Sequence, residues 1–97
     1  MLLLVVMVAA AARGDDAPDG RRIFTAGAAP PCGVCHTLAA AGTEGEIGPN
    51  LDQLKPDSGR VRRAVTSGPG SMPAYDSLNE AEIEAVARYV AEVAGKG

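Results

Sequence analysis

The most regular pattern of apolar and polar positions lies at the C-terminal end of the chain. Asn79, with Glu82 three residues later, is typical of a capping box, and Gly95 is suited to end a helix. Between these signals, apolar residues recur at helical spacing at Ile83, Val86, Ala87, Val90 and Ala94. The pattern predicts a helix between Asn79 and Gly95 that packs one face against the rest of the domain.

Another helix is predicted shortly before the cysteines of the chain. Asp19 is placed to cap a helix over residues 20–27, on which Ile23 and Phe24 face inward. Gly27 and the two prolines that follow it are expected to stop this helix, because proline cannot continue the helical hydrogen bonding. A turn should then lead into the first cysteine.

The middle of the chain has weaker periodicity. Residues 59–67, capped by Asp57 or Ser58, predict a helix with three apolar residues on one face, Val61, Ala64 and Val65. Residues 42–56 contain three glycines and two prolines and fit neither period, so they predict an ordered loop. No segment alternates for long enough to predict a strand. The predicted fold class is therefore all-α, with three to five short helices joined by long turns.

The first twelve residues carry no charge and run from a leucine- and valine-rich stretch into an alanine tract. The run is shorter than the roughly 20 residues of a membrane-spanning helix, and its small residues suit signal-peptide cleavage. We therefore expect residues 1–12 to be an export signal or, because a basic start is missing, a retained membrane-surface anchor. Residues 13–18 are expected to form a flexible lead-in, and residues 19–97 the folded domain.

Composition limits how this domain can be stabilised. The roughly 85 residues after the leader offer few bulky apolar side chains for a core. The chain has only two cysteines, and a disulfide between positions three apart closes too small a loop to stabilise the fold much. A large apolar cofactor is the expected substitute. The net charge of −3 and the pI of about 5.0 argue against a nucleic-acid partner.

The motif that carries chemistry is CGVCH at residues 32–36. The thiols of Cys32 and Cys35 can add to the two vinyl groups on one edge of a porphyrin, so that the imidazole of His36 meets the iron. Two other interpretations are open. A redox-active dithiol of the thioredoxin kind would need a βαβ setting, and a structural zinc site would need four ligands. The sequence predicts no strands and contains a single histidine, so covalent haem is favoured.

A second iron ligand can be sought by elimination. His36 is the only histidine, and Met72 is the only methionine outside the leader. Met72 lies within residues 68–73, GPGSMP, a segment that cannot be helical and can wrap a side chain over a flat ring. The alternative is that Met72 fills core space, as methionine often does. Ligation by His36 and Met72 would give a relatively high reduction potential and leave no open coordination site.

At these residues the sequence resembles the class I cytochrome c family, over nearly all of the chain after the leader. Residues 48–51, GPNL, resemble the family's loop in which a proline carbonyl accepts the second ring N–H of the proximal histidine, which implies that Pro49 is the partner of His36. Met72 resembles the family's distal methionine. The resemblance implies a small cytochrome c fold around one covalent haem, with its first and last helices crossing at Gly20, Phe24, Val86 and Tyr89.

The expected function is electron transfer, without enzyme activity, by a monohaem c-type cytochrome that shuttles single electrons between redox partners. One haem c would be held by Cys32 and Cys35, with His36 and Met72 as iron ligands. We expect a monomer, exported to the periplasm or the outer face of the cytoplasmic membrane, with transient partners and no membrane contact beyond them or an uncleaved leader. Two alternatives stay open: a cytochrome subunit of a dehydrogenase or oxidase complex, and a haem sensor or enzyme with an open sixth site.

Overall fold

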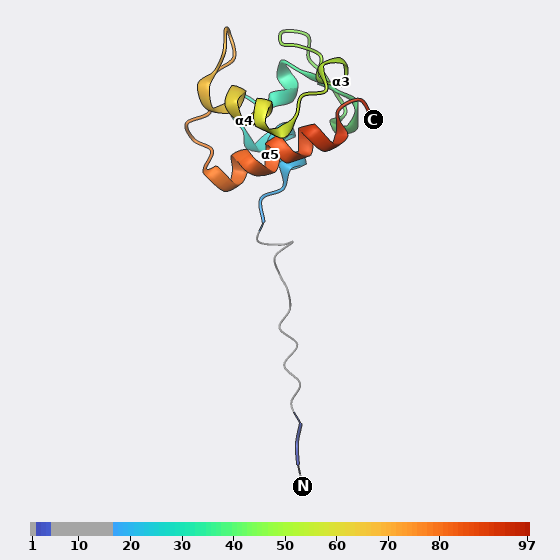
Figure 1. Ribbon diagram of the computed structural model, residues 1–97, viewed down its shortest axis with the longest axis vertical. Helices are drawn as coiled ribbons and strands as arrows, with labels where there is room; N and C mark the ends of the chain where they lie inside the picture. Colours follow the sequence, from blue (N-terminus) through green and yellow to red (C-terminus); the bar gives the residue numbers. More distant parts are fainter. Residues whose placement is uncertain (1, 5–16) are drawn as a thin grey trace.

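The computed structural model describes residues 2–4 and 17–97 (Figure 1). The predicted leader, residues 1–12, and the lead-in, residues 13–18, lie largely outside these ranges. Among the described residues, no helix has the length and apolarity that crossing a membrane requires. The elements in chain order are α2 (Gly20–Arg22), η1 (Ile23–Gly27), η2 (Cys32–Val34), β1 (Thr37–Leu38), η3 (Ala39–Ala41), β2 (Thr43–Glu44), α3 (Leu51–Leu54), α4 (Ser58–Ser67) and α5 (Glu80–Val93).

The mostly helical architecture confirms the predicted fold class, with two corrections. The expectation of no strands is wrong, because β1 and β2 pair antiparallel through Thr37 with Glu44 and Leu38 with Thr43. Strands of two residues are too short to leave a periodic signature. The expectation of a loop over residues 42–56 is wrong in part, because α3 lies within it. The Asn50 side chain accepts hydrogen bonds from two backbone N–H groups of this helix and so starts a single turn.

The two longest helices begin and end where the sequence predicted. The Asp57 side chain caps α4 by accepting from the Arg60 N–H at 2.7 Å, although the helix starts one residue earlier than expected. At α5 both halves of the capping box between Asn79 and Glu82 are formed. Figure 1 shows α4 lying over α5, and the apolar faces of these two helices contribute much of the core.

The first helical segment, α2 continued by η1, packs on α5 as the family resemblance implied. Gly20 is required there, because a Cβ at this position would collide with the carbonyl oxygen of Ala85 and lie 2.5 Å from the Tyr89 Cβ. One turn further along, Phe24 is buried against Tyr89 with ring centroids 6.3 Å apart and planes inclined by 57°. This contact fixes the first segment on the last helix.

Replacing Gly20 by alanine is expected to destabilise the protein by about 1–3 kcal/mol, because the added methyl group meets backbone that cannot move aside. Gly59→Ala in α4 is the matched control. Its methyl group would meet no backbone, only the side-chain ends of Arg63 at 3.3 Å, Asp57 at 3.5 Å and Arg62 at 3.8 Å, so helix propensity should make the variant neutral or up to about 1 kcal/mol more stable. Denaturant unfolding of the two variant holoproteins measures the change in the free energy of unfolding. Equal changes for the two substitutions would contradict a close backbone contact between α2 and α5 at Gly20.

Asp52 in α3 ties two distant segments together. One carboxylate oxygen accepts from the Ala39 N–H at 2.9 Å, and the other accepts from the Gly95 N–H at 2.8 Å. These two hydrogen bonds to the ionised form lower the pKa of Asp52 below its usual value. The chain end after α5 is therefore held beside α3, as Figure 1 also shows.

This carboxylate predicts a pH-dependent part of the stability. Because the pKa of Asp52 is lower in the folded state than in the unfolded chain, its contribution is complete above the unfolded pKa of about 3.9 and is lost as the pH falls through the folded value. Asp52→Asn should cost about 1–2 kcal/mol near neutral pH, and the difference from wild type should shrink on acidification. Urea unfolding over a pH series measures this, and a difference that stays constant would refute it.

Candidate functional site

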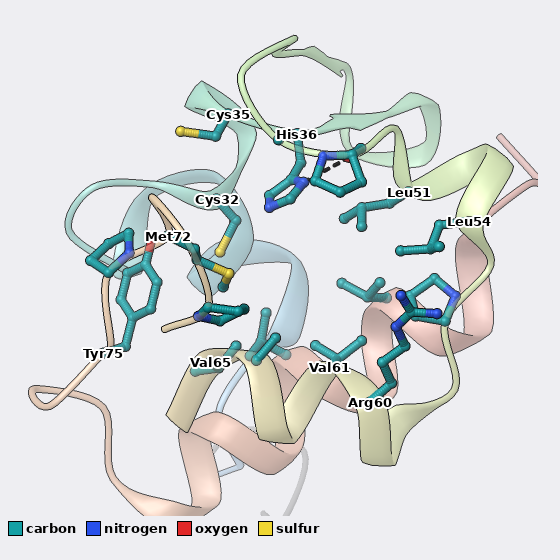
Figure 2. Close-up of a pocket in the computed structure, with 18 of the residues that line it drawn as sticks. Cys32, Cys35, His36, Leu51, Leu54, Arg60, Val61, Val65, Met72 and Tyr75 are labelled. Carbon is teal, nitrogen blue, oxygen red and sulfur yellow. Dashed lines mark hydrogen bonds between the residues drawn. The ribbon is translucent and has the colours of Figure 1, made fainter. Parts of the chain in front are cut away.

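A cavity of about 460 Å³ opens between α3, α4, α5 and the loops that carry the predicted site residues (Figure 2). This volume falls in the range of cofactor pockets, which is roughly 300–1,000 Å³. Its walls are mainly apolar, and they include Phe24, Ile47, Leu51, Leu54, Pro56, Val61, Ala64, Val65, Val86 and Val90. All five predicted site residues, Cys32, Cys35, His36, Pro49 and Met72, also line it.

The two cysteines are presented by η2, a single 3-10 turn that Pro31 introduces. The carbonyl oxygen of Cys32 accepts from the N–H groups of Cys35 at 3.2 Å and His36 at 3.0 Å, which closes the turn and brings all three side chains to one wall. Cys32 is buried and Cys35 is half-buried, and they are not joined in a disulfide. Burial raises the pKa of the Cys32 thiol to about 11. The free thiol is therefore neutral at physiological pH.

Residues 48 and 49 hold the His36 ring in one orientation. Its Nδ1 lies 2.7 Å from the carbonyl oxygen of Pro49, and since a carbonyl can only accept, Nδ1 carries the proton and donates. Gly48 packs directly against the ring, because a Cβ there would lie 2.5 Å from the histidine Cε1. The Gly48 N–H in turn donates to the Cys35 carbonyl at 2.7 Å. With Nδ1 engaged, Nε2 is the ring nitrogen left to bind a metal in the cavity.

Met72 enters the cavity from a different segment, the loop between α4 and α5, and Figure 2 shows its side chain directed inward. The loop leaves α4 through Gly68, whose φ of +64° and contact with the Ala74 N–H leave no room for a side chain. The Tyr75 N–H donates to the Val65 carbonyl at 2.9 Å. The Tyr75 hydroxyl donates to the carbonyl of Pro30 at 2.7 Å, which joins this loop to the segment before Cys32.

The residues present fit a haem. The walls are apolar and match the flat hydrophobic body of a porphyrin, while one imidazole and one thioether reach the cavity from separate segments and both are good iron ligands. The two thiols on the η2 wall suit vinyl addition. Within residues 2–4 and 17–97, no three His, Cys, Asp or Glu side chains are grouped to hold a metal ion without such a ring.

Sequence reasoning missed part of this wall. Residues 42–56 were predicted as an ordered loop in which only the 48–51 segment, through Pro49, had a role at the site, yet Leu51, Leu54 and Pro56 line the cavity. A signal was available in the spacing of the two leucines, which are three residues apart after a capping asparagine. The predicted apolar face of α4 does line the cavity, through Val61, Ala64 and Val65.

A family model described as cytochrome C oxidase, cbb3-type, subunit III matches residues 15–90 of the chain. The chain belongs to the class I monohaem c-type cytochromes. A crystal structure of the c-type cytochrome SorU from Sinorhizobium meliloti is 60% identical in sequence to this cytochrome, with a TM-score of 0.78 over 79% of this chain and 88% of that one. No curated protein sequence matches it significantly.

Membership of this family decides among the interpretations of CGVCH. The cytochrome carries one covalently attached haem c with its iron, and it transfers electrons to and from redox partners. The dithiol alternative finds no support in the local structure either, since no strand precedes η2 within residues 17–31 and the two short strands that follow it are antiparallel. C-type cytochrome domains of this kind are typically exported.

Proposed function

We propose that this cytochrome is a diffusible one-electron carrier whose haem is attached through Cys32 and Cys35 and ligated by His36 and Met72. The observation that carries the proposal is the convergence of these four side chains on one apolar cavity. Pro49 would keep His36 in the tautomer and orientation that ligation needs, because its carbonyl accepts the Nδ1 proton. The haem iron supplies the one-electron couple, and the protein contributes ligands and an apolar surround.

Ligation by both side chains argues for a carrier without enzyme activity. Thioether sulfur favours ferrous iron and so raises the reduction potential, and two protein ligands leave no site for a substrate or gas. The Met72 loop is fastened at Val65 and at Pro30 by the hydrogen bonds of Tyr75, so its ligand is positioned in advance. Such pre-ordering favours fast electron exchange, because little has to move when the iron changes charge.

The proposed location of the carrier rests on its predicted export signal, and the proposed kind of partner rests on charge steering between small interfaces. We propose that residues 1–12 direct export, that residues 13–18 are a lead-in and that residues 19–97 act as a monomer in the periplasm or at the outer face of the cytoplasmic membrane. Its donor and acceptor would be redox proteins that bind transiently, since small, charge-steered interfaces permit rapid turnover.

The test is an optical titration of the purified, reduced holoprotein with carbon monoxide. A carrier with two firm protein ligands should keep its low-spin spectrum unchanged. Rapid formation of a carbon monoxide adduct would contradict the proposal and favour a sensor or enzyme with an open sixth site.

A second candidate is a permanent cytochrome subunit of a dehydrogenase or oxidase complex. It is favoured by the matching family model, whose description is that of an oxidase subunit. Two exposed apolar side chains near the haem cavity, Ile47 at 75% and Val34 at 55% exposure, also suit a lasting interface. Native electrophoresis of periplasmic and membrane fractions separates the candidates, since a carrier migrates at the size of one small chain and a subunit migrates with a large complex.

A further inference from the structure

Residues 43–48 pack directly against the backbone of the CGVCH turn, residues 32–36. A Cβ at Gly45 would lie 2.6 Å from a backbone atom of each of residues 34, 35 and 36. Such a close approach is possible only because residue 45 has no side chain. The Gly48 N–H holds the Cys35 carbonyl from the same segment. Residues 43–48 are therefore placed to determine where the backbone of the turn lies.

One side chain of this segment, that of Thr43, contacts the turn in two ways. Its methyl group lies against Gly33, because a Cβ there would collide with the methyl carbon and lie 2.8 Å from the Thr43 Cβ. Its hydroxyl group donates to the His36 carbonyl oxygen at 2.9 Å and accepts from the Leu38 N–H at 3.1 Å. The Leu38 carbonyl oxygen is farther from the hydroxyl, at 3.4 Å, so the single hydroxyl proton is assigned to the His36 carbonyl.

The other hydroxyl groups with hydrogen bonds have different partners. Within residues 2–4 and 17–97, only the Thr43 hydroxyl bonds to the backbone of His36. The hydroxyl of Thr37, one residue after the histidine, donates to the Gly45 carbonyl at 2.9 Å. It is a bond of similar length in the same part of the fold, but it does not reach His36. Thr37 therefore offers a matched comparison for Thr43, and both side chains are half-buried.

His36 is thus held at both ends. Its carbonyl oxygen accepts from Thr43, and its ring Nδ1 donates to the Pro49 carbonyl at 2.7 Å. We propose that Thr43 is a positioning residue for the proximal ligand: its hydroxyl group fixes the His36 backbone so that the ring keeps its short hydrogen bond to Pro49. This inference rests on the proposed ligation of the iron by His36.

The expected effect on the reduction potential has a definite sign. The hydrogen bond from Nδ1 to a carbonyl raises the basicity of the imidazole, and a more basic ligand favours the more highly charged ferric iron. Without the Thr43 hydroxyl, the His36 backbone can shift, the bond to Pro49 lengthens and the potential rises. A general loosening of the domain that weakened the Met72 ligand would lower the potential instead. The sign therefore separates a positioning role from a merely structural one.

The experiment is redox titration of Thr43→Val holoprotein beside wild type, Thr43→Ser and Thr37→Val. Valine keeps nearly the shape of threonine without its hydroxyl group, serine keeps the hydroxyl group, and Thr37→Val removes the neighbouring bond to Gly45. In Thr43→Val we expect the one-electron equilibrium to shift by roughly twofold to threefold, or about 20–30 mV, to higher potential. Thr43→Ser and Thr37→Val should stay at the wild-type potential.

A vibrational measurement reads the proximal bond directly. Resonance Raman spectra of the reduced Met72→Ala and Met72→Ala/Thr43→Val proteins, in which the sixth site is open, compare their iron–histidine stretching bands. We expect a lower frequency in the double variant, because a less basic imidazole makes a weaker bond to iron. If the Thr43→Val protein does not retain haem, Thr43→Ala and Thr37→Ala are compared under the same expectations.

Three outcomes would overturn the inference: an unchanged potential and stretching band in Thr43→Val, a lower potential in Thr43→Val, and an equal rise in Thr37→Val. Any of them, with a normal low-spin spectrum that resists carbon monoxide, would refute the role of Thr43 while leaving the electron-carrier proposal standing. Rapid carbon monoxide binding by the wild type would instead refute the carrier. The stretching band would then be compared in the wild type and Thr43→Val themselves.

Discussion

Replacing Met72 by alanine is expected to convert the low-spin haem into one with an open sixth site. The thioether is the only sulfur ligand in the cavity apart from the two cysteines of the attachment motif, and no second histidine exists to replace it. The spectrum should become high-spin in both oxidation states, and the reduced variant should bind carbon monoxide rapidly. The reduction potential should fall by on the order of 100 mV, within the roughly 0.8 V range that axial ligands span.

Leu54→Ala is the matched control for this substitution. Leu54 is another partly buried side chain on the cavity wall, and it has no atom that can bind iron. Truncating either residue removes a similar apolar volume at a cost of about 2–5 kcal/mol in stability. Only the methionine variant should change the spin state and admit carbon monoxide. If Met72→Ala keeps a low-spin spectrum and merely loses stability as Leu54→Ala does, Met72 is a core residue and the proposed ligation is wrong.

The parts of this molecule that sequence reasoning predicted are those governed by local rules. The capping box of Asn79 and Glu82, the Asp19 and Asp57 caps and the apolar stripe of α5 are each encoded within a few residues, and each is present in the structure. The cofactor was predictable for a similar reason, since the spacing of residues 32–36 corresponds to the chemistry of one porphyrin edge.

The parts that were missed depend on contacts between distant segments. The Asp52 carboxylate bonds to the Gly95 N–H, 43 positions away, and nothing near Asp52 in the sequence identifies that partner. The ion pair between Arg62 of α4 and Glu84 of α5, at 2.9 Å, was likewise not predictable, because it depends on how the two helices pack against each other. Short elements such as β1 and α3 escaped because two to four residues contain too little of a period to recognise.

Removing the haem is expected to unfold the domain. Several of its buried side chains, Phe24, Leu51, Val65, Tyr75, Val86 and Val90, form walls of the haem cavity as well as the core. At about 24 cal/mol per Å³, a void of this size would cost on the order of 10 kcal/mol. That cost is comparable to the whole stability of a domain of this length, which is about 4–13 kcal/mol at roughly 0.05–0.15 kcal/mol per residue. We therefore expect the empty domain to have little or no stability left, because the haem is part of its core.

The double variant Cys32→Ala/Cys35→Ala, purified without haem, tests this. It should lose most far-ultraviolet helical signal and all near-ultraviolet signal, and it should show no cooperative thermal transition. The single variant Cys35→Ala is the control, since one remaining thioether at the buried Cys32, with His36 still held by Pro49, should keep the haem in place and the domain folded. A haem-free double variant that melts cooperatively with native-like near-ultraviolet signal would show that the protein side chains alone suffice for the fold. The cavity would then be a binding site within an independent core rather than the centre of that core.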